Sequence, residues 1–224
     1  MEKVIDNIYM KKIIYFNLYV IKGTDGDILI DTGFFCMKKS IKKWLDKFNI
    51  KLIILTHAHI DHSWNVAYIK KLYNCEVALG KKDLININNK NINTVASKKR
   101  YKLFTELMKF GMKTLPNPLY EVDYLLKDKE KINKYGLELQ IHNLAGHTNG
   151  SIGILYKDYL FVGDALVNRL KVSIAFQNQN IKKAIKSSKK IMRLNPKMVF
   201  FGHDKEVSLE KLLKDLTPKT RESR

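Results

Sequence analysis

The stretch THAHIDH, residues 56–62, decides the fold of this chain. It holds three of the six histidines in a sequence of 224 residues, and it directly follows the apolar run LIIL at residues 52–55. A short apolar run of this kind predicts a buried strand. Loops at strand ends carry function when a rigid sheet positions them. The sequence therefore predicts a functional site in the loop that follows this strand.

Histidines and aspartates also follow three other expected strands, at His147, Asp164 and His203. Five of the six histidines thus lie just past a strand end, and only His142, expected to be an ordinary histidine, lies elsewhere. The candidate metal ligands are His57, His59, Asp61, His62, His147, Asp164 and His203. Imidazole and carboxylate groups suit Zn²⁺, and also Fe or Mn. Seven ligands are too many for one tetrahedral ion and fit two ions.

The charge balance is strongly basic, with a formal net charge of +19 from 41 Lys+Arg and 22 Asp+Glu. Such an excess raises the question of nucleic acid or an anionic membrane as partner. The lysines are scattered, however, and the tightest cluster, at residues 81–82 and 98–100, has no Gly/aromatic RNA-binding signature. We therefore expect neither nucleic acid nor a membrane as partner. The positive field of two metal ions and of the lysine-rich surface instead favours a small anionic substrate.

The sequence carries no targeting signal that we can identify. No stretch approaches the ~20 apolar residues that span a bilayer, and the first ten residues lack the basic head and apolar block of a signal peptide. Cys36 and Cys75 form no disulfide framework and indicate ordinary thiols in a reducing compartment. We expect a cytoplasmic protein. The oligomeric state is not encoded in any pattern we find.

Local patterns predict strands mixed with helices in both halves, which favours two sheets with helices outside. Strands are expected at residues 13–21, 28–31, 51–56, 76–79, 120–126, 137–144, 151–156, 159–163 and 198–202. Helices are expected at residues 37–48, 63–73, 181–194 and 208–216. The length fits one domain with a large core. We place that domain at residues 1–216, followed by a frayed tail at 217–224.

The stretch 81–118 differs from the rest of the domain. It is rich in lysine and asparagine, turns helical, and stops at the sequence PNP. We expect a helical insertion that lies over one edge of the fold, with a substrate lid as the favoured role. Its apolar residues Phe104, Leu107, Met108 and Phe110 are expected to pack against the protein.

An ordered set of motifs now connects these observations. The motifs are ILIDTG (28–33), THAHIDH (56–62), GHTNGS (146–151), VGDAL (162–166) and FFGHD (200–204). Together they resemble the metallo-β-lactamase-fold hydrolases, and among these the glyoxalase II-like members, over nearly the whole chain. The resemblance implies an αββα sandwich, a mixed α+β fold in which two mixed sheets are flanked by helices. It also implies a two-metal site along one edge.

The resemblance assigns roles to the candidate ligands. It implies that one ion is held by the three residues His57, His59 and His147, and that the other is held by Asp61, His62 and His203. Asp164 is the implied bridge between the ions, and Asp31 is an implied supporting carboxylate behind the ligands. Two divalent ions are implied, with zinc favoured and iron or manganese as alternatives.

The implied activity is hydrolysis by a hydroxide that bridges the two ions, acting on a small ester, a glyoxalase II-like thioester or a lactone. Asp61 would orient this nucleophile as well as bind metal. Asp164 argues against the true β-lactamases, which generally lack this bridging residue. Phe176 and Asn168, after the bridging aspartate, are candidates for the substrate pocket.

Two alternative functions remain open at this point. A metal-dependent phosphodiesterase or nuclease would agree with the basic charge. A persulfide dioxygenase with one iron shares the H-x-H-x-D-H pattern. In each case the protein would be an enzyme that depends on a bound metal.

Overall fold

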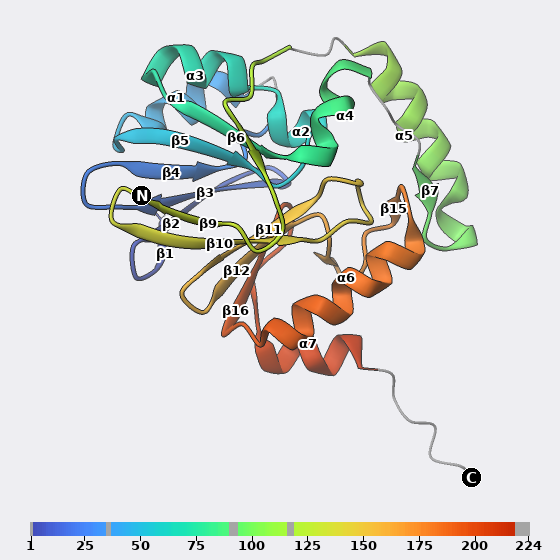
Figure 1. Cartoon of the computed structure of the whole chain (residues 1–224). Coiled ribbons are helices and arrows are strands. Elements are labelled where there is room, and N and C mark those ends of the chain that lie inside the picture. Colours follow the sequence, from blue (N-terminus) through green and yellow to red (C-terminus); the bar gives the residue numbers. More distant parts are fainter. Residues whose placement is uncertain (1, 35–36, 90–93, 116–118, 218–224) are drawn as a thin grey trace.

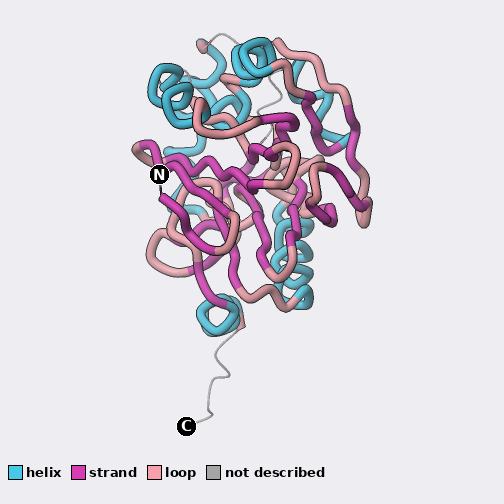
Figure 2. The backbone as a smooth tube through the Cα atoms, turned by 90° about the vertical axis from the view of Figure 1, so that its left-hand side faces the viewer, coloured by secondary structure: helices cyan, strands magenta, loops and turns pink. Residues whose placement is uncertain are grey.

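The protein is described by a computed structural model that covers residues 2–34, 37–89, 94–115 and 119–217. Two β-sheets pack face to face, and helices cover both outer faces (Figure 1). Figure 2, turned by 90°, shows the strands in the middle of the molecule between layers of helix. Each sheet contains both parallel and antiparallel pairs. This is the expected αββα sandwich of two mixed sheets, so the predicted fold class is confirmed.

The first sheet is formed mainly by the N-terminal half of the chain. Its order is β1-β2-β3-β4-β5-β6-β8. The strands are β1 (Glu2–Ile5), β2 (Ile8–Ile13), β3 (Phe16–Lys22), β4 (Asp27–Ile30), β5 (Ile50–Leu55), β6 (Glu76–Gly80) and β8 (Tyr124–Leu126). The pairs β4–β5, β5–β6 and β6–β8 are parallel, so their carboxyl ends share one edge of the sheet.

The second sheet comes from the C-terminal half. Its order is β17-β16-β12-β11-β10-β9. The strands are β9 (Lys131–Lys134), β10 (Leu137–Asn143), β11 (Ile152–Tyr156), β12 (Tyr159–Gly163), β16 (Met198–Phe201) and β17 (Val207–Ser208). Because β12 and β16 are parallel, the residues that follow them emerge at the same edge.

Helices and short ribbons complete the chain. The helices are α1 (Lys38–Leu45), α2 (Ile60–Ser63), α3 (Val66–Tyr73), α4 (Leu84–Asn89), α5 (Lys102–Thr114), α6 (Ile181–Leu194) and α7 (Leu209–Leu216), with 3-10 turns at Lys81–Asp83 and Lys99–Tyr101. Two small ribbons pair β13 (Val167–Asn168) with β14 (Val172–Ser173), and β7 (Val95–Ala96) with β15 (Gln177–Asn178).

The apolar strands are buried on both faces, which explains their continuous hydrophobic runs. In β5, Leu52 and Ile54 belong to the apolar cluster between the two sheets, which also contains Phe161. The alternate residue Ile53 belongs instead to the cluster under α1 and α3, which contains Trp44. A third apolar cluster joins the outer face of the second sheet to α6 and α7. Three apolar clusters between the four layers therefore hold the strand ends rigidly.

Several elements differ from the sequence-based expectation. The hairpin β1–β2 was not expected, because its residues are mostly half-buried and alternate weakly between apolar and polar. The helix expected at residues 63–73 corresponds to α3, which begins at Val66, and the short helix α2 precedes it at Ile60–Ser63. The expected strand at residues 120–126 is shortened to β8, because Tyr120 and Val122 pack against the α1 and α3 layer without pairing in the sheet.

The described residues of the stretch 81–118 form the helices α4 and α5, two 3-10 turns and the short strand β7, and α5 lies at the side of the molecule (Figure 1). Leu107 and Phe110 are 62% and 72% exposed, so the expectation that they pack against the protein is wrong. The side chains of Phe104 and Met108 lie outside the described residues, as do Cys36 and the tail after Thr217. The division into one domain with an insertion stays a prediction.

Candidate metal centre

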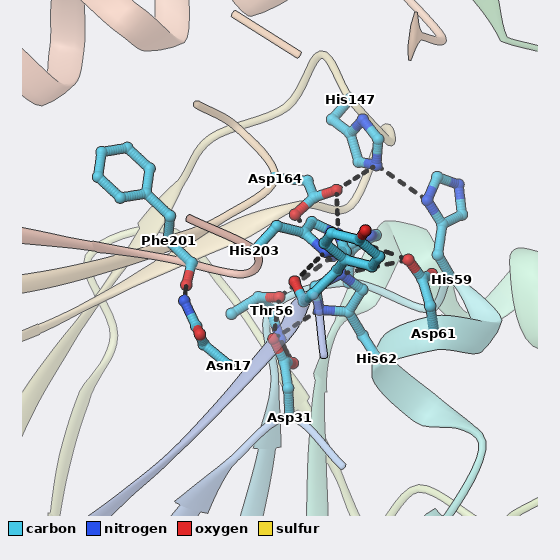
Figure 3. Close-up of polar contacts among 12 residues, drawn as sticks. Asn17, Asp31, Thr56, His59, Asp61, His62, His147, Asp164, Phe201 and His203 are labelled. Atoms are coloured by element: carbon cyan, nitrogen blue, oxygen red, sulfur yellow. Dashed lines mark hydrogen bonds and ion pairs between the residues drawn. The ribbon is translucent and has the colours of Figure 1, made fainter. Parts of the chain in front are cut away.

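The structure brings together all seven predicted ligand residues at one edge of the sandwich (Figure 3). His57, His59, Asp61 and His62 come from the loop after β5 and the first turn of α2. His147 lies in the loop between β10 and β11, and Asp164 and His203 directly follow β12 and β16. Both sheets therefore contribute to the cluster.

The ligand atoms form overlapping groups whose members lie within 4.8 Å of one another. The groups are His57–His59–His147, His57–His62–Asp164 and Asp61–His62–His203. These groups have the composition that the resemblance implied, with Asp164 between the two outer groups. Whether these residues bind metal in the expected division stays a prediction.

The first group is a compact set of imidazoles. Nε2 of His147 lies 2.9 Å from Nδ1 of His59. The ring centroid of His57 lies 4.7 Å from that of His59 and 4.8 Å from that of His147. Three imidazoles at this spacing provide the all-nitrogen face that suits Zn²⁺.

The second group mixes imidazoles with carboxylates. Nε2 of His203 lies 3.3 Å from Nε2 of His62 and 3.5 Å from Oδ2 of Asp61. Asp164 reaches both groups. Its Oδ2 lies 3.1 Å from Nε2 of His203 and 3.7 Å from Nε2 of His147. One carboxylate therefore lies where a bridging ligand would be needed.

Hydrogen bonds at the rear of the rings fix which nitrogen faces the centre. Nδ1 of His147 donates to the carbonyl oxygen of Gln177 at 2.8 Å, and Nδ1 of His203 donates to that of Tyr15 at 2.9 Å. Nδ1 of His62 lies 2.8 Å from Oδ2 of Asp31. When these rings are neutral, the partners assign the ring proton to Nδ1. The lone pair of Nε2 then points toward the centre of the cluster.

Thr56 holds Nδ1 of His57 in the same way. The hydroxyl of Thr56 donates to Oδ2 of Asp31 at 2.8 Å, so it accepts from Nδ1 of His57 at 3.1 Å. Asp31 thus supports two ligand histidines, one directly and one through Thr56. Asp31 is 3% exposed and has a φ of +59°, a left-handed conformation that aspartate tolerates better than most residues. Its place agrees with a supporting carboxylate.

The cluster fits divalent ions because its inward-facing atoms lack partners. Nε2 of His57 and Oδ1 of Asp164 are buried without a hydrogen bond. Native proteins rarely leave buried polar atoms unpaired. In addition, lone pairs of His62 and His203 face each other, which requires either a retained proton or a cation between them. A pair of cations would satisfy all of these atoms together.

The pKa shifts in the metal-free cluster have clear physical causes. Burial lowers the pKa of His57 well below its usual range, and burial with the nearby His147 lowers the pKa of His59 to about 3. Burial would also lower the pKa of His203, but the carboxylate of Asp164 raises it to about 9.

The same balance acts on His62, where burial is outweighed by Asp31, Asp61 and Asp164, so its pKa lies well above the usual range. The pKa of Asp164 is well below its usual range because His203 and His62 outweigh burial. The carboxylates around the second group therefore favour the protonated forms of His62 and His203. A metal ion that bound here would have to displace those protons.

A pocket of about 240 Å³ opens onto the cluster. His59, Asp61, His147, Asp164 and His203 line it on the ligand side. Phe176, a predicted substrate residue, also lines the pocket. Asn168 does not line it, because its side chain donates to the carbonyl oxygen of Lys205 at 3.0 Å.

Sequence reasoning missed other pocket residues. Tyr15 and Phe16 come from the β2–β3 hairpin, and Arg169 comes from the turn between β13 and β14. No local motif marks them, since their place depends on how distant hairpins meet. The only available signal was the position of Arg169 five residues after Asp164.

The fold and this cluster define a class of metal-binding hydrolase, and comparisons with known proteins agree. The model of the metallo-beta-lactamase superfamily matches residues 17–203. A probable metallo-hydrolase of Methanocaldococcus jannaschii is 34% identical over 153 residues, which cover 67% of this chain and 66% of that relative. The chain thus spans slightly less than two thirds of that relative's length.

Two further proteins are similar over most of the chain. Hydroxyacylglutathione hydrolase 1 of Vibrio vulnificus is 25% identical over 208 residues, or 91% of this chain and 68% of that protein. A protein whose crystal structure is described in a di-iron-bound form has a TM-score of 0.68 at 23% identity, covering 94% of this chain and 98% of that chain.

This chain therefore belongs to the metallo-beta-lactamase superfamily, a superfamily of metallo-hydrolases that bind divalent metals. None of the described helices combines the length and the hydrophobicity that a bilayer-spanning segment needs.

Proposed function

We propose that this protein is a hydrolase that uses two divalent metal ions to cleave a small anionic ester, thioester or lactone. The observation that carries the proposal is the set of seven ligand residues in two groups that share Asp164 as their link. Two bound ions would lower the pKa of a water molecule between them and polarise the carbonyl group of the substrate. No serine or cysteine nucleophile is then required.

The protein's own residues would position the reactants. The first ion would be held by His57, His59 and His147, and the second by Asp61, His62 and His203. Zinc suits this donor set best. Iron and manganese are alternatives, and the di-iron-bound form of a structural relative supports iron in particular.

Asp61 is the proposed proton acceptor. Its side chain is 28% exposed and lines the pocket, and its Oδ2 lies 3.5 Å and 3.8 Å from Nε2 of His203 and His62. A carboxylate in this place can orient the attacking water and accept its proton. It would do so while keeping contact with the second group.

The pocket wall supports an anionic substrate. Arg169 is the one lysine or arginine among the pocket-lining residues, and no ion pair of the described residues involves it. Its guanidinium can bind a carboxylate in a bidentate manner. Phe16 and Phe176 offer apolar surface for the acyl part. The similarity to a hydroxyacylglutathione hydrolase supports a thioester.

The cellular compartment is part of the same proposal. Cys75 is a free and buried thiol. Such a residue agrees with a reducing, cytoplasmic environment. Small-molecule turnover, without nucleic acid or a membrane, is the proposed setting.

The test is metal analysis of the purified protein together with a hydrolysis panel of thioester, lactone, phosphodiester and β-lactam substrates. The proposal expects about two ions per chain and turnover of a thioester, ester or lactone. Phosphodiester cleavage alone would favour the nuclease alternative. One iron per chain, with oxygen uptake on a persulfide and no hydrolysis, would replace the proposal by the dioxygenase alternative.

Variants make the test specific. His59→Ala and Asp164→Ala should each lower metal content and reduce kcat/KM by more than ~100-fold, because each removes a ligand. His142→Ala is the matched control, since His142 is a buried histidine on β10 outside the cluster. Near-normal turnover in both ligand variants would contradict the two-metal mechanism.

A further inference from the structure

Asp83 is a buried acidic residue with no role in the metal centre as described so far. It ends the 3-10 turn Lys81–Asp83, directly after β6, where the insertion begins. Its exposed fraction is 0%. An unpaired carboxylate at this depth would be costly, so its partners decide what it does.

Four donors surround the carboxylate of Asp83. Oδ2 accepts from the backbone N–H of Ala58 at 2.8 Å and from the hydroxyl of Thr148 at 2.9 Å. Oδ1 accepts from the backbone N–H of Gly150 at 2.9 Å and from the amide of Asn86 at 2.8 Å. A carboxylate has about four acceptor sites. Each one is therefore used.

Three of the four donors belong to the two loops that carry the first ligand group, whereas Asn86 lies in α4. Ala58 lies between His57 and His59, and Thr148 directly follows His147. The loops are far apart in sequence, since Asp83 is 25 residues from Ala58 and 65 residues from Thr148. One carboxylate thus joins both backbone segments that position the three imidazoles.

The approach between these segments is close. A Cβ atom on Gly150 would lie 2.2 Å from the backbone nitrogen of Asp83 and 2.7 Å from its Oδ1. Thr148 is also fixed from its other side, because its hydroxyl lies 2.7 Å from that of Ser151. The glycine therefore permits a close contact that any side chain at position 150 would block.

We propose that Asp83 is a positioning residue for the three-histidine group, because it fixes the loop of His57 and His59 against the loop of His147. The inference rests on the proposed function, since it takes these histidines to be metal ligands. Residues behind metal ligands commonly set metal affinity through ligand orientation. Because Asp83 lies in the first turn of the insertion, this turn then helps to support the metal centre.

The four hydrogen bonds require a side chain of this shape whose two oxygens both accept. In Asp83→Asn, an NH₂ group replaces one oxygen and faces either Ala58 N–H or Gly150 N–H, two donors that it cannot accept from. One loop then loses its anchor while the side-chain volume is kept. Metal affinity should fall even where the fold survives.

Asp27 provides a matched control for a merely structural role. It is 3% exposed, and it accepts from the backbone N–H of Gly23 at 3.1 Å and of Asn49 at 2.7 Å. It begins β4, whereas the metal cluster lies beyond the opposite end of the parallel strands. Asp27→Asn therefore removes a similar buried anchor without touching the ligand loops.

The experiment compares the wild-type protein, Asp83→Asn and Asp27→Asn. Each metal-free protein is titrated with Zn²⁺ against a chelating dye, and its melting temperature is measured separately. We expect both variants to melt earlier. Asp83→Asn should weaken one Zn²⁺-binding step by ~10–100-fold, whereas Asp27→Asn should stay within about two-fold of the wild type.

Wild-type Zn²⁺ affinity in Asp83→Asn, or an equal loss in Asp27→Asn, would overturn the inference. If Asp83→Asn does not fold, Thr148→Val and Thr148→Ser replace it. Thr148→Val removes the hydroxyl donor and should weaken Zn²⁺ binding. Thr148→Ser keeps the hydroxyl and should bind Zn²⁺ with the affinity of the wild type. Equal affinities in this pair would overturn the inference too. Absence of binding of Zn²⁺, Fe²⁺ and Mn²⁺ by the wild type would instead refute the proposed function.

Discussion

His59 and His203 show how neighbours decide the charge of chemically identical residues. Both lie half-buried in one cluster, yet the pKa of His59 falls to about 3 while that of His203 rises to about 9. The side chain of His59 has another imidazole, that of His147, as its closest polar contact. The side chain of His203 lies 3.1 Å from the carboxylate of Asp164. Burial disfavours charge at both sites, and only the second has a close compensating anion.

These opposite shifts predict a maximum in the stability of the metal-free protein. The pKa of both residues in the unfolded chain is near 6.5. From about pH 3 to 6.5 the unfolded chain binds more protons at His59, so stability rises with pH. From 6.5 to about 9 the folded chain binds more protons at His203, so stability falls. Melting temperatures of chelator-treated protein from pH 5 to 9 measure this.

His203→Asn is the control for the pH prediction. It removes the imidazole whose pKa is raised, and the decline above pH 6.5 should become shallower. A melting temperature that rises steadily through pH 8 in the wild type would contradict the prediction.

Strand β12 illustrates how an element delivers a ligand. It ends at Gly163, whose φ of +52° turns the chain sharply before Asp164. A Cβ atom at this glycine would lie 2.4 Å from Oγ1 of Thr56, the hydroxyl that connects Asp31 to His57. The end of a strand in one sheet therefore touches the hydrogen-bond network of the other.

Gly163→Ala should lower both stability and metal affinity. The left-handed conformation alone costs about 1–2 kcal/mol for a residue with a Cβ atom, and the contact would displace Thr56. Gly136→Ala is a matched control, because Gly136 has a φ of +71° and its Cβ would lie 2.4 Å from Oγ1 of Thr24. Unfolding curves and Zn²⁺ titrations compare the two. Equal metal affinities would show that the turn at Gly163 is irrelevant to the centre.

Elements with strong local patterns were predicted well. The apolar run of β12 and the 3.6-residue periodicity of α6 gave the observed bounds, because β12 is buried along its whole length and α6 buries one face. The seven cluster residues were predicted from a local signal too, since polar residues at strand ends stand out against apolar runs.

Contacts between distant segments were not predictable. The side chain of Asp83 is satisfied by loops that are 25 and 65 residues away, and no local pattern encodes that meeting. Arg169 lines the pocket because it lies in the turn between the two-residue strands β13 and β14. The apolar periodicity of α5 was read as packing, yet Leu107 and Phe110 face outward. Periodicity reveals an apolar face, but it does not reveal whether the protein covers that face.

Over the whole molecule, the metal centre lies where the two sheets meet. Polar anchors already join them beside it, because the hydroxyl of Tyr19 on β3 donates to the carbonyl oxygen of Phe201 at 2.7 Å. Asn17 donates to the same oxygen at 3.1 Å (Figure 3). Ions held by ligands from both halves would add further links across this junction.

Removal of metal should therefore lower global stability. A ligand present at 100 times its Kd adds about 2.7 kcal/mol, which corresponds to roughly 5–10 °C in melting temperature for a chain of this size. Calorimetry with and without a chelator measures the shift. The variant Asp164→Ala should show a much smaller shift. An unchanged melting temperature in the wild type would contradict a structural contribution of the ions.

The separation of the ligands along the chain has a consequence for biosynthesis. Facing nitrogens of His62 and His203 lie 3.3 Å apart in space but 141 residues apart in sequence. At synthesis rates of about 5–20 residues per second, roughly 7–28 s separate the translation of the two histidines. The histidines that are synthesised first lie in an incomplete site until His203 is added, so we expect full metal loading to follow tertiary folding. Stopped-flow refolding with a metal-sensitive dye should show ion uptake at the rate of the slowest folding phase.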